Sequence, residues 1–145
     1  MKILICFVIL LSACLFTQCK SSTATGSSNA TLENTYWKLA EMNGMPVITP
    51  ADSRDVHFIL TKTENQNQLK GFAGCNTLAG SYTVEGVKIS FTTITTRMFC
   101  EGKMEVENYF TKTLSDATAY KINGNVLELY QGETFLARFD AVYLK

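Results

Sequence analysis

From residue 32 onwards, apolar and polar residues alternate in short runs, separated by Asn-Gly, Glu-Gly and proline-containing segments. A two-residue period is typical of a strand with one buried face, and Asn-Gly between two such runs is a strong hairpin signal. The polar stretch at residues 61–68, TKTENQNQ, predicts a turn. The pattern predicts strands at residues 36–40, 56–60, 69–73, 81–84, 87–92, 119–122, 126–130 and 135–143.

One segment has a different period. Between residues 101 and 117, apolar residues recur at three- and four-residue spacing, which predicts a single amphipathic helix. Strands, one helix and further strands, with no repeat and no second domain, indicate an α+β fold that is mostly β. We expect a strongly curved, barrel-like antiparallel sheet with the one α-helix packed on it.

Most of the aromatic residues lie on the alternating runs. This placement is typical of the core of a small domain, so we expect a core rather than a ligand cage. The residues are Tyr36, Trp37, Phe58, Phe72, Phe91, Phe110 and Phe139.

The N-terminus has the layout of an export signal. Lys2 supplies a positive charge, and residues 3–11 are apolar without a break. Even when it is extended through Thr17, the apolar stretch has only ~15 residues, whereas a membrane-spanning helix needs ~20. The pattern therefore predicts a signal peptide, at residues 1–13, rather than a transmembrane anchor.

The signal ends in a lipobox-like sequence, Leu11-Ser12-Ala13-Cys14, with small residues before the cysteine. We expect Cys14 to carry the lipid of a bacterial lipoprotein. Cys19 is the alternative, because it gives a more ordinary signal length, although bulky Gln18 precedes it. With either cysteine, the mature protein would be held at a membrane.

Residues 14–31 are expected to form the lipidated tether. From residue 20 the tether consists almost entirely of Ser, Thr, Gly, Asn and Ala, too little apolar surface to fold. A flexible chain of this length holds the domain roughly 20 Å from the bilayer. The expected location is the bacterial cell envelope, lipid-anchored and facing the periplasm.

The remainder, Leu32 to Lys145, has the size of one small domain, and we expect it to be a monomer. The chain has 13 basic and 13 acidic residues, and loss of Lys2 leaves 12 against 13. This balance lacks the basic excess of a nucleic-acid-binding domain. Cys75 and Cys100 are the cysteines of this domain, and export favours one disulfide between them.

The glycine-rich stretch GFAGCNTLAGSY at residues 71–82 invites a phosphate-binding interpretation. Gly71, Gly74 and Gly80 do not have the spacing of a dinucleotide loop, and no Gly-Lys-Ser/Thr follows. We instead expect tight turns and close backbone approach, with Asn76 hydrogen-bonding its own turn.

Catalytic and metal-binding patterns are weak. Cys75 with His57 as its base is the one thiol arrangement, but His57 lies in a strand pattern and export favours oxidation of the thiol. One histidine and two separated cysteines fall short of a structural zinc site. The carboxylates Glu101 and Glu105 suit the exposed start of a helix. We therefore expect no metal, no cofactor and no enzymatic activity; a small exported hydrolase or thiol enzyme is the alternative.

Four segments together resemble the META domain, the HslJ-like family, over residues 32–145. They are YWKLAEMNG at 36–44, LKGFAGCNTLAGSY at 69–82, ISFTTITTRMFC at 89–100 and VENYFTKTL at 106–114. The closing stretch NVLELYQGETFLARF is similar to the last strands of the family. Phe99 departs from the pattern, because many relatives carry a small residue there, and we expect tighter packing around Cys100. The motif residues are Gly74, Cys75, Asn76, Gly80, Tyr82, Thr96, Met98 and Cys100.

The resemblance implies a β-rich fold with one helix and an exported or lipid-anchored protein associated with envelope stress and drug tolerance. It implies no established catalytic activity. We expect a non-catalytic protein that binds an envelope protein or an apolar ligand. Met98 and Phe99 beside the disulfide would provide the contact; as the alternative, both are core residues.

Overall fold

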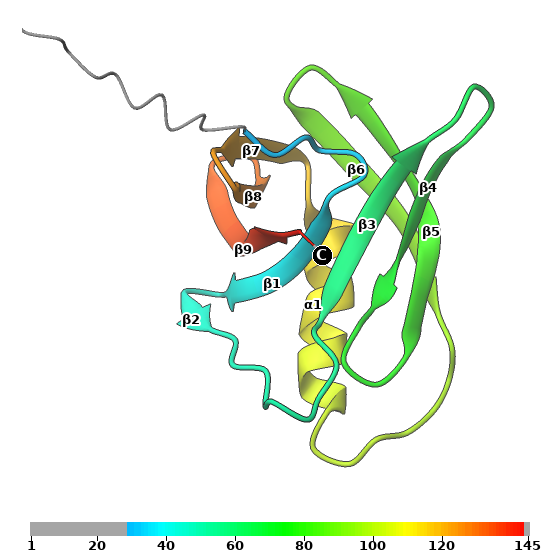
Figure 1. Ribbon diagram of the computed structural model, residues 1–145, viewed down its shortest axis with the longest axis vertical. Coiled ribbons are helices and arrows are strands. Elements are labelled where there is room, and N and C mark those ends of the chain that lie inside the picture. The colour runs from blue at the N-terminus through cyan, green and yellow to red at the C-terminus, as the bar shows by residue number, and fades with distance from the viewer. Residues whose placement is uncertain (1–28, 144–145) are drawn as a thin grey trace, which may run out of the picture.

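The computed structural model describes residues 29–143, which form one antiparallel sheet of nine strands and one helix (Figure 1). The first strands along the chain are β1 (Tyr36–Met42), β2 (Met45–Pro46), β3 (His57–Lys62), β4 (Asn67–Phe72), β5 (Thr77–Glu85) and β6 (Lys88–Thr95). The helix α1 (Met104–Asp116) follows, and then β7 (Ala119–Asn123), β8 (Val126–Gln131) and β9 (Thr134–Val142).

The sheet curves until its strand pairings close into a ring. The order is β2-β1-β3-β4-β5-β6-β7-β8-β9, and β1 also pairs with β9. The junction between β6 and β7 is the thinnest, since its ladder consists of the pair Lys88 and Ala119. The helix connects these two strands and buries Phe110 and Leu114, and the Phe110 ring lies 6.1 Å from that of Phe139 on β9. The expected fold class is confirmed.

The core follows from the alternation along the strands. Trp37 and Leu39 on β1, and Leu127 and Leu129 on β8, are fully buried, whereas the residues between them are only partly buried. The Trp37 indole N–H donates to the Leu32 carbonyl oxygen at 3.0 Å, so this buried donor has a partner.

Two of the aromatic residues expected in the core lie outside it. The Tyr36 ring stacks on the His57 imidazole with a centroid distance of 4.1 Å, and the Arg54 guanidinium lies 4.7 Å from the centre of Phe72. Tyr36 is one position from Trp37, and Phe72 one from Gly71; both neighbours are buried. Successive strand residues point to opposite faces, so this prediction was wrong for Tyr36 and Phe72.

All eight predicted strands and the helix are present, with shifted ends. Because β3 continues to Lys62 and β4 begins at Asn67, the turn predicted at residues 61–68 contains only residues 63–66. The helix begins at Met104 rather than at residue 101. There the Lys103 N–H donates to the Cys100 carbonyl oxygen at 3.1 Å and Gly102 has φ +73°, so a turn precedes the helix.

The described chain begins close to the predicted start of the domain. Ala30 and Leu32 are buried, and the Ala30 N–H donates to the Gly124 carbonyl oxygen at 2.9 Å. The signal peptide, Cys14, Cys19 and nearly all of the predicted tether lie outside the described residues. Among residues 29–143, no helix is long and apolar enough to cross a membrane.

Candidate functional site

A disulfide links two loops that are far apart in the sequence. Cys75 lies between β4 and β5, and Cys100 lies between β6 and α1, with a Cα–Cα distance of 5.7 Å. The predicted pairing is confirmed. Beside it, Asn76, Thr96, Met98 and Glu107 form a hydrogen-bond network. We call these six residues the latch.

Asn76 is the centre of the latch and is almost completely buried. Its side-chain oxygen accepts hydrogen bonds from the Thr96 hydroxyl at 2.7 Å and from the Met98 N–H at 2.8 Å. Its side-chain nitrogen donates to the Met98 carbonyl oxygen at 2.9 Å and to Glu107 Oε1 at 2.8 Å.

The Asn76 side chain therefore bonds across the loops. The prediction that it would bond within its own turn was wrong. The turn is closed by the backbone instead, because the Ala73 N–H donates to the Asn76 carbonyl oxygen at 2.9 Å. The amide group suits this bridging position because it offers two donors and a two-lone-pair acceptor in one plane.

Glu107 brings a buried carboxylate to the same place from the first half of α1. Its Oε2 accepts the backbone N–H groups of Asn76 at 2.8 Å and of Cys75 at 3.2 Å. With the bond from the Asn76 amide, three N–H donors surround a carboxylate that is only 5% exposed. Such charge-assisted bonds compensate for desolvation, and an acid near a helix start is also favoured by the helix dipole.

Glu107 was not among the site residues predicted from the sequence. A signal for it was present, because Glu107 lies three residues before Phe110 and seven before Leu114. This spacing places the carboxylate on the buried face of the helix. An acid on an apolar helix face needs a partner, and here that partner is the Cys75-Asn76 turn.

The glycines of the motif have separate roles. Gly74 has φ +119°, a conformation that favours glycine at the turn before Cys75. A Cβ on Gly71 would lie 2.2 Å from the His57 carbonyl oxygen, and one on Gly80 would lie 2.0 Å from that of Thr92. Gly71 and Gly80 thus permit the close backbone approach expected from the sequence, but they lie within strands rather than in turns.

The remaining motif residues join neighbouring segments. The Thr96 hydroxyl also accepts the Thr77 N–H at 3.2 Å. Tyr82 is buried on β5, and its hydroxyl donates to Glu33 Oε1 at 3.2 Å, which fixes the segment before β1. Burial first, and then the charge and hydrogen bond of Glu33, raise the pKa of Tyr82 to about 12.

The latch exposes two large apolar side chains. Met98 is 59% exposed and Phe99 is 82% exposed, although the Met98 backbone is bonded to Asn76 at both its N–H and its carbonyl oxygen. The alternative that these residues belong to the core is therefore wrong. Tighter packing by Phe99 around Cys100 is wrong too, because the Phe99 side chain points largely into solvent.

The residues considered for thiol chemistry have other partners. The Cys75 sulfur is in the disulfide, and the buried His57 pairs its Nδ1 with the Asp55 carbonyl oxygen at 2.8 Å. Burial lowers the pKa of His57, and the positive charge of Arg54 lowers it further, while Asp55 opposes both. Within residues 29–143, no group of three or more His, Cys, Asp and Glu side chains could hold a metal ion.

Solved structures with the same fold exist. An NMR structure of a protein from Burkholderia xenovorans is 25% identical, with a TM-score of 0.61 over 78% of this chain and 85% of that one. A second NMR structure is 19% identical, with a TM-score of 0.58 over 76% of this chain and 94% of the other. Among curated proteins, none matches the chain.

The family model described as META domain matches residues 30–143, a span that begins at the buried Ala30 and includes the whole sheet, the helix and the latch. The chain therefore belongs to the META domain family.

Proposed function

We propose that this protein is a non-catalytic, lipid-anchored envelope protein that binds a protein or an apolar ligand through the surface beside the latch. The observation that carries the proposal is the pair Met98 and Phe99, which are exposed on a loop that a disulfide and hydrogen bonds to the buried Asn76 hold in place. Exposed apolar groups on a prefixed backbone suit recognition, because little conformational entropy is lost on binding.

The position where the described chain begins supports a binding role for the Met98–Phe99 surface. The described chain enters beside the β7–β8 turn, where Ala30 bonds to Gly124, and Figure 1 shows the loops around the start of α1 at the opposite end of the domain. A lipid anchor before residue 29 would then be attached at the end of the domain remote from the Met98–Phe99 surface, which leaves that surface accessible to a ligand.

Anchoring is tested separately from binding. Mass spectrometry of the membrane-extracted protein should find a mature N-terminal peptide beginning at diacylated Cys14. Lipid on Cys19 instead would move the processing site and keep the anchor, whereas an uncleaved signal would refute lipid anchoring.

Binding is tested with Phe99→Ser in the full-length protein. We expect host survival under envelope stress to fall while the melting temperature stays near that of the wild type, since the side chain is 82% exposed. Val87→Ser is the matched control, because Val87 is 69% exposed and precedes β6, whereas Phe99 follows it. Equal survival of both variants and the wild type would contradict a binding role for this surface.

A further inference from the structure

A groove opens next to the latch, between the loop before β3 and the start of α1. Its volume is about 240 Å³. Figure 1 shows both segments at the same end of the domain. Its lining includes Val47, Arg54, Val56, Gly74, Lys103 and Val106.

The walls of the groove are mainly aliphatic, and its depth depends on a glycine. Val47, Val56 and Val106 are partly or fully buried, and no aromatic ring lines the space. A Cβ on Gly74 would lie 3.7 Å from Val56 Cγ2 and 3.8 Å from Val106 Cγ1. The absent side chain therefore leaves room between two valines at the turn that the latch holds.

Two residues of the lining are charged, and both are cations. Arg54 is placed by its contact with the Phe72 ring at 4.7 Å, and Lys103 lies at the start of α1. Within residues 29–143, neither side chain forms an ion pair. An apolar space with two free cations and no lining acid is complementary to an apolar chain that carries a negative head group.

We infer that this groove binds a single-chain carboxylate amphiphile, a fatty-acid-like molecule, with its chain between the valines and its carboxylate at Arg54 and Lys103. The inference goes beyond the proposed function, because neither Met98 nor Phe99 lines the groove. The volume is below the roughly 300–1,000 Å³ typical of drug-sized pockets, which favours one narrow chain over a ring system.

The larger groove along β4 and β5 does not suit such a ligand. It has about 750 Å³, but amide and hydroxyl side chains line much of it, including Asn65, Gln66, Ser81 and Thr83. It serves as an internal comparison, because a probe that simply follows available space would label it instead.

The test uses the full-length protein in phosphatidylcholine nanodiscs and a dodecanoic acid that carries a photoreactive diazirine near its chain end. After irradiation, peptide mapping should locate the label at residues 47–56 and 102–106. The corresponding diazirine alcohol, which lacks the carboxylate, should label these peptides about fivefold less, in line with the loss of two charge contacts to exposed side chains. Label concentrated at residues 65–83, or equal labelling by acid and alcohol, would overturn the inference.

Variants separate charge from folding. The double variant Arg54→Gln, Lys103→Gln should lower labelling at the groove about fivefold, and Lys103→Gln alone should lower it by a smaller factor. The control Lys112→Gln, Lys121→Gln removes two exposed lysines outside the groove and should leave labelling unchanged. Unchanged labelling in Lys103→Gln and in the double variant would refute the assignment.

The labelling of the groove and the survival of the Phe99→Ser variant test separate hypotheses. If Phe99→Ser impairs survival but the groove takes no label, the binding role of the Met98–Phe99 surface is supported and the amphiphile site is refuted. If the groove takes label as expected but Phe99→Ser leaves survival unchanged, the amphiphile site is supported and the Met98–Phe99 surface has no binding role.

Discussion

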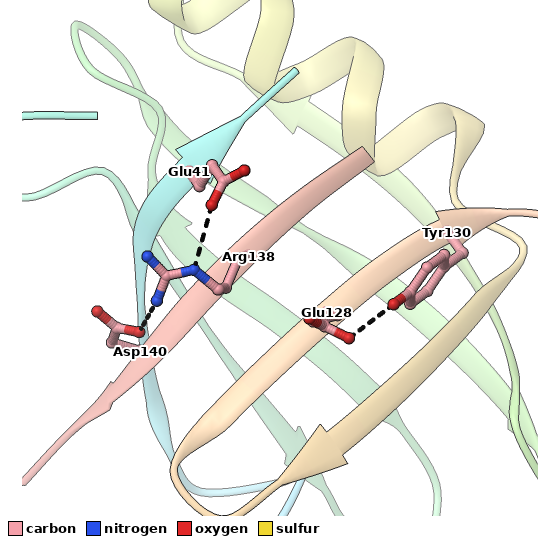
Figure 2. Close-up of polar contacts among 5 residues, drawn as sticks. All are labelled: Glu41, Glu128, Tyr130, Arg138 and Asp140. Carbon is pink, nitrogen blue, oxygen red and sulfur yellow. Dashed lines mark hydrogen bonds and ion pairs between the residues drawn. The ribbon is translucent and has the colours of Figure 1, made fainter. Parts of the chain in front are cut away.

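The latch and the outer face of β7, β8, β9 and β1 both consist of polar contacts between distant parts of the chain, but they differ in burial. On the outer face, the strand register aligns Lys121 with Glu128, Glu128 with Arg138, and Arg138 with Glu41. We call these four residues the charge row. Figure 2 shows Arg138 between Glu41 and Asp140. The Arg138 guanidinium lies 3.4 Å from Glu41 Oε2 and 2.7 Å from Asp140 Oδ1.

The energetic consequence of burial separates the two regions. The side chains of Glu41, Arg138 and Asp140 are 31%, 34% and 49% exposed, so water competes for each ion pair. Asn76 and Glu107 are at most 5% exposed, and loss of one partner would leave the other buried without a hydrogen bond. The charge row helps to specify strand register, whereas the latch determines where two loops lie.

The largest effect is expected from removal of the disulfide in the double variant Cys75→Ser, Cys100→Ser. The bridge spans a sequence separation of 25 residues, and a closed loop of that size is worth about 3.5 kcal/mol on the chain-entropy model. Urea unfolding should show this loss, and reduced wild-type protein should match the variant. Unchanged stability in both would mean that the latch needs no covalent link.

Glu107→Gln tests whether the buried carboxylate is required. A glutamine offers one carbonyl oxygen, so its NH₂ group would face one of the N–H donors from Cys75 and Asn76. We expect a loss of about 1–3 kcal/mol in the free energy of unfolding. Glu105→Gln, two residues earlier and exposed, is the control and should cost no more than about 0.5 kcal/mol. An equal loss in the free energy of unfolding in both variants would show that burial of the acid does not matter.

His57 provides an intermediate case, since it is buried but has a single hydrogen bond, to the Asp55 backbone. Burial holds its pKa in the folded protein below the usual value of about 6.5. Below that pH the unfolded chain binds more protons than the folded protein. Stability should therefore fall as the pH is lowered from about 6.5 to the folded pKa, and then level off. Urea unfolding across this range should show that the free energy of unfolding decreases with falling pH, and that the decrease is smaller in His57→Gln. The same pH dependence in the variant and the wild type would contradict this role of His57.

The smallest effect is expected in the charge row. Arg138→Ala removes both ion pairs, each with a partly exposed partner, and should cost about 0.2–1 kcal/mol per pair. The loss should shrink further in high salt, where exposed charges are screened. A loss as large as that of Glu107→Gln in thermal or urea unfolding would show that burial is not what separates the two regions.

Much of the fold could be predicted from local pattern. The period-two runs and the Asn123-Gly124 turn placed eight of the nine strands, because a strand's buried face recurs every second residue regardless of its neighbours. The two-residue strand β2 (Met45–Pro46) was missed, because it is too short to show a period. The disulfide could also be predicted, since an exported domain with two cysteines has one simple pairing. Strand ends were less accurate, as at Lys62 and Asn67, because polar residues extend a hairpin wherever their backbone groups find a partner strand.

The sequence by itself determined the class of fold, the helix, the cysteine pair and the family motif, all of which depend on composition, short-range period or spacing. The tertiary structure alone decided that Asn76 reaches Met98 and Glu107, that Phe99 is exposed, and that Arg54 and Lys103 line one groove. These facts depend on contacts between segments more than 20 residues apart. Their geometry follows from how the sheet closes and where the helix packs, which no local pattern specifies.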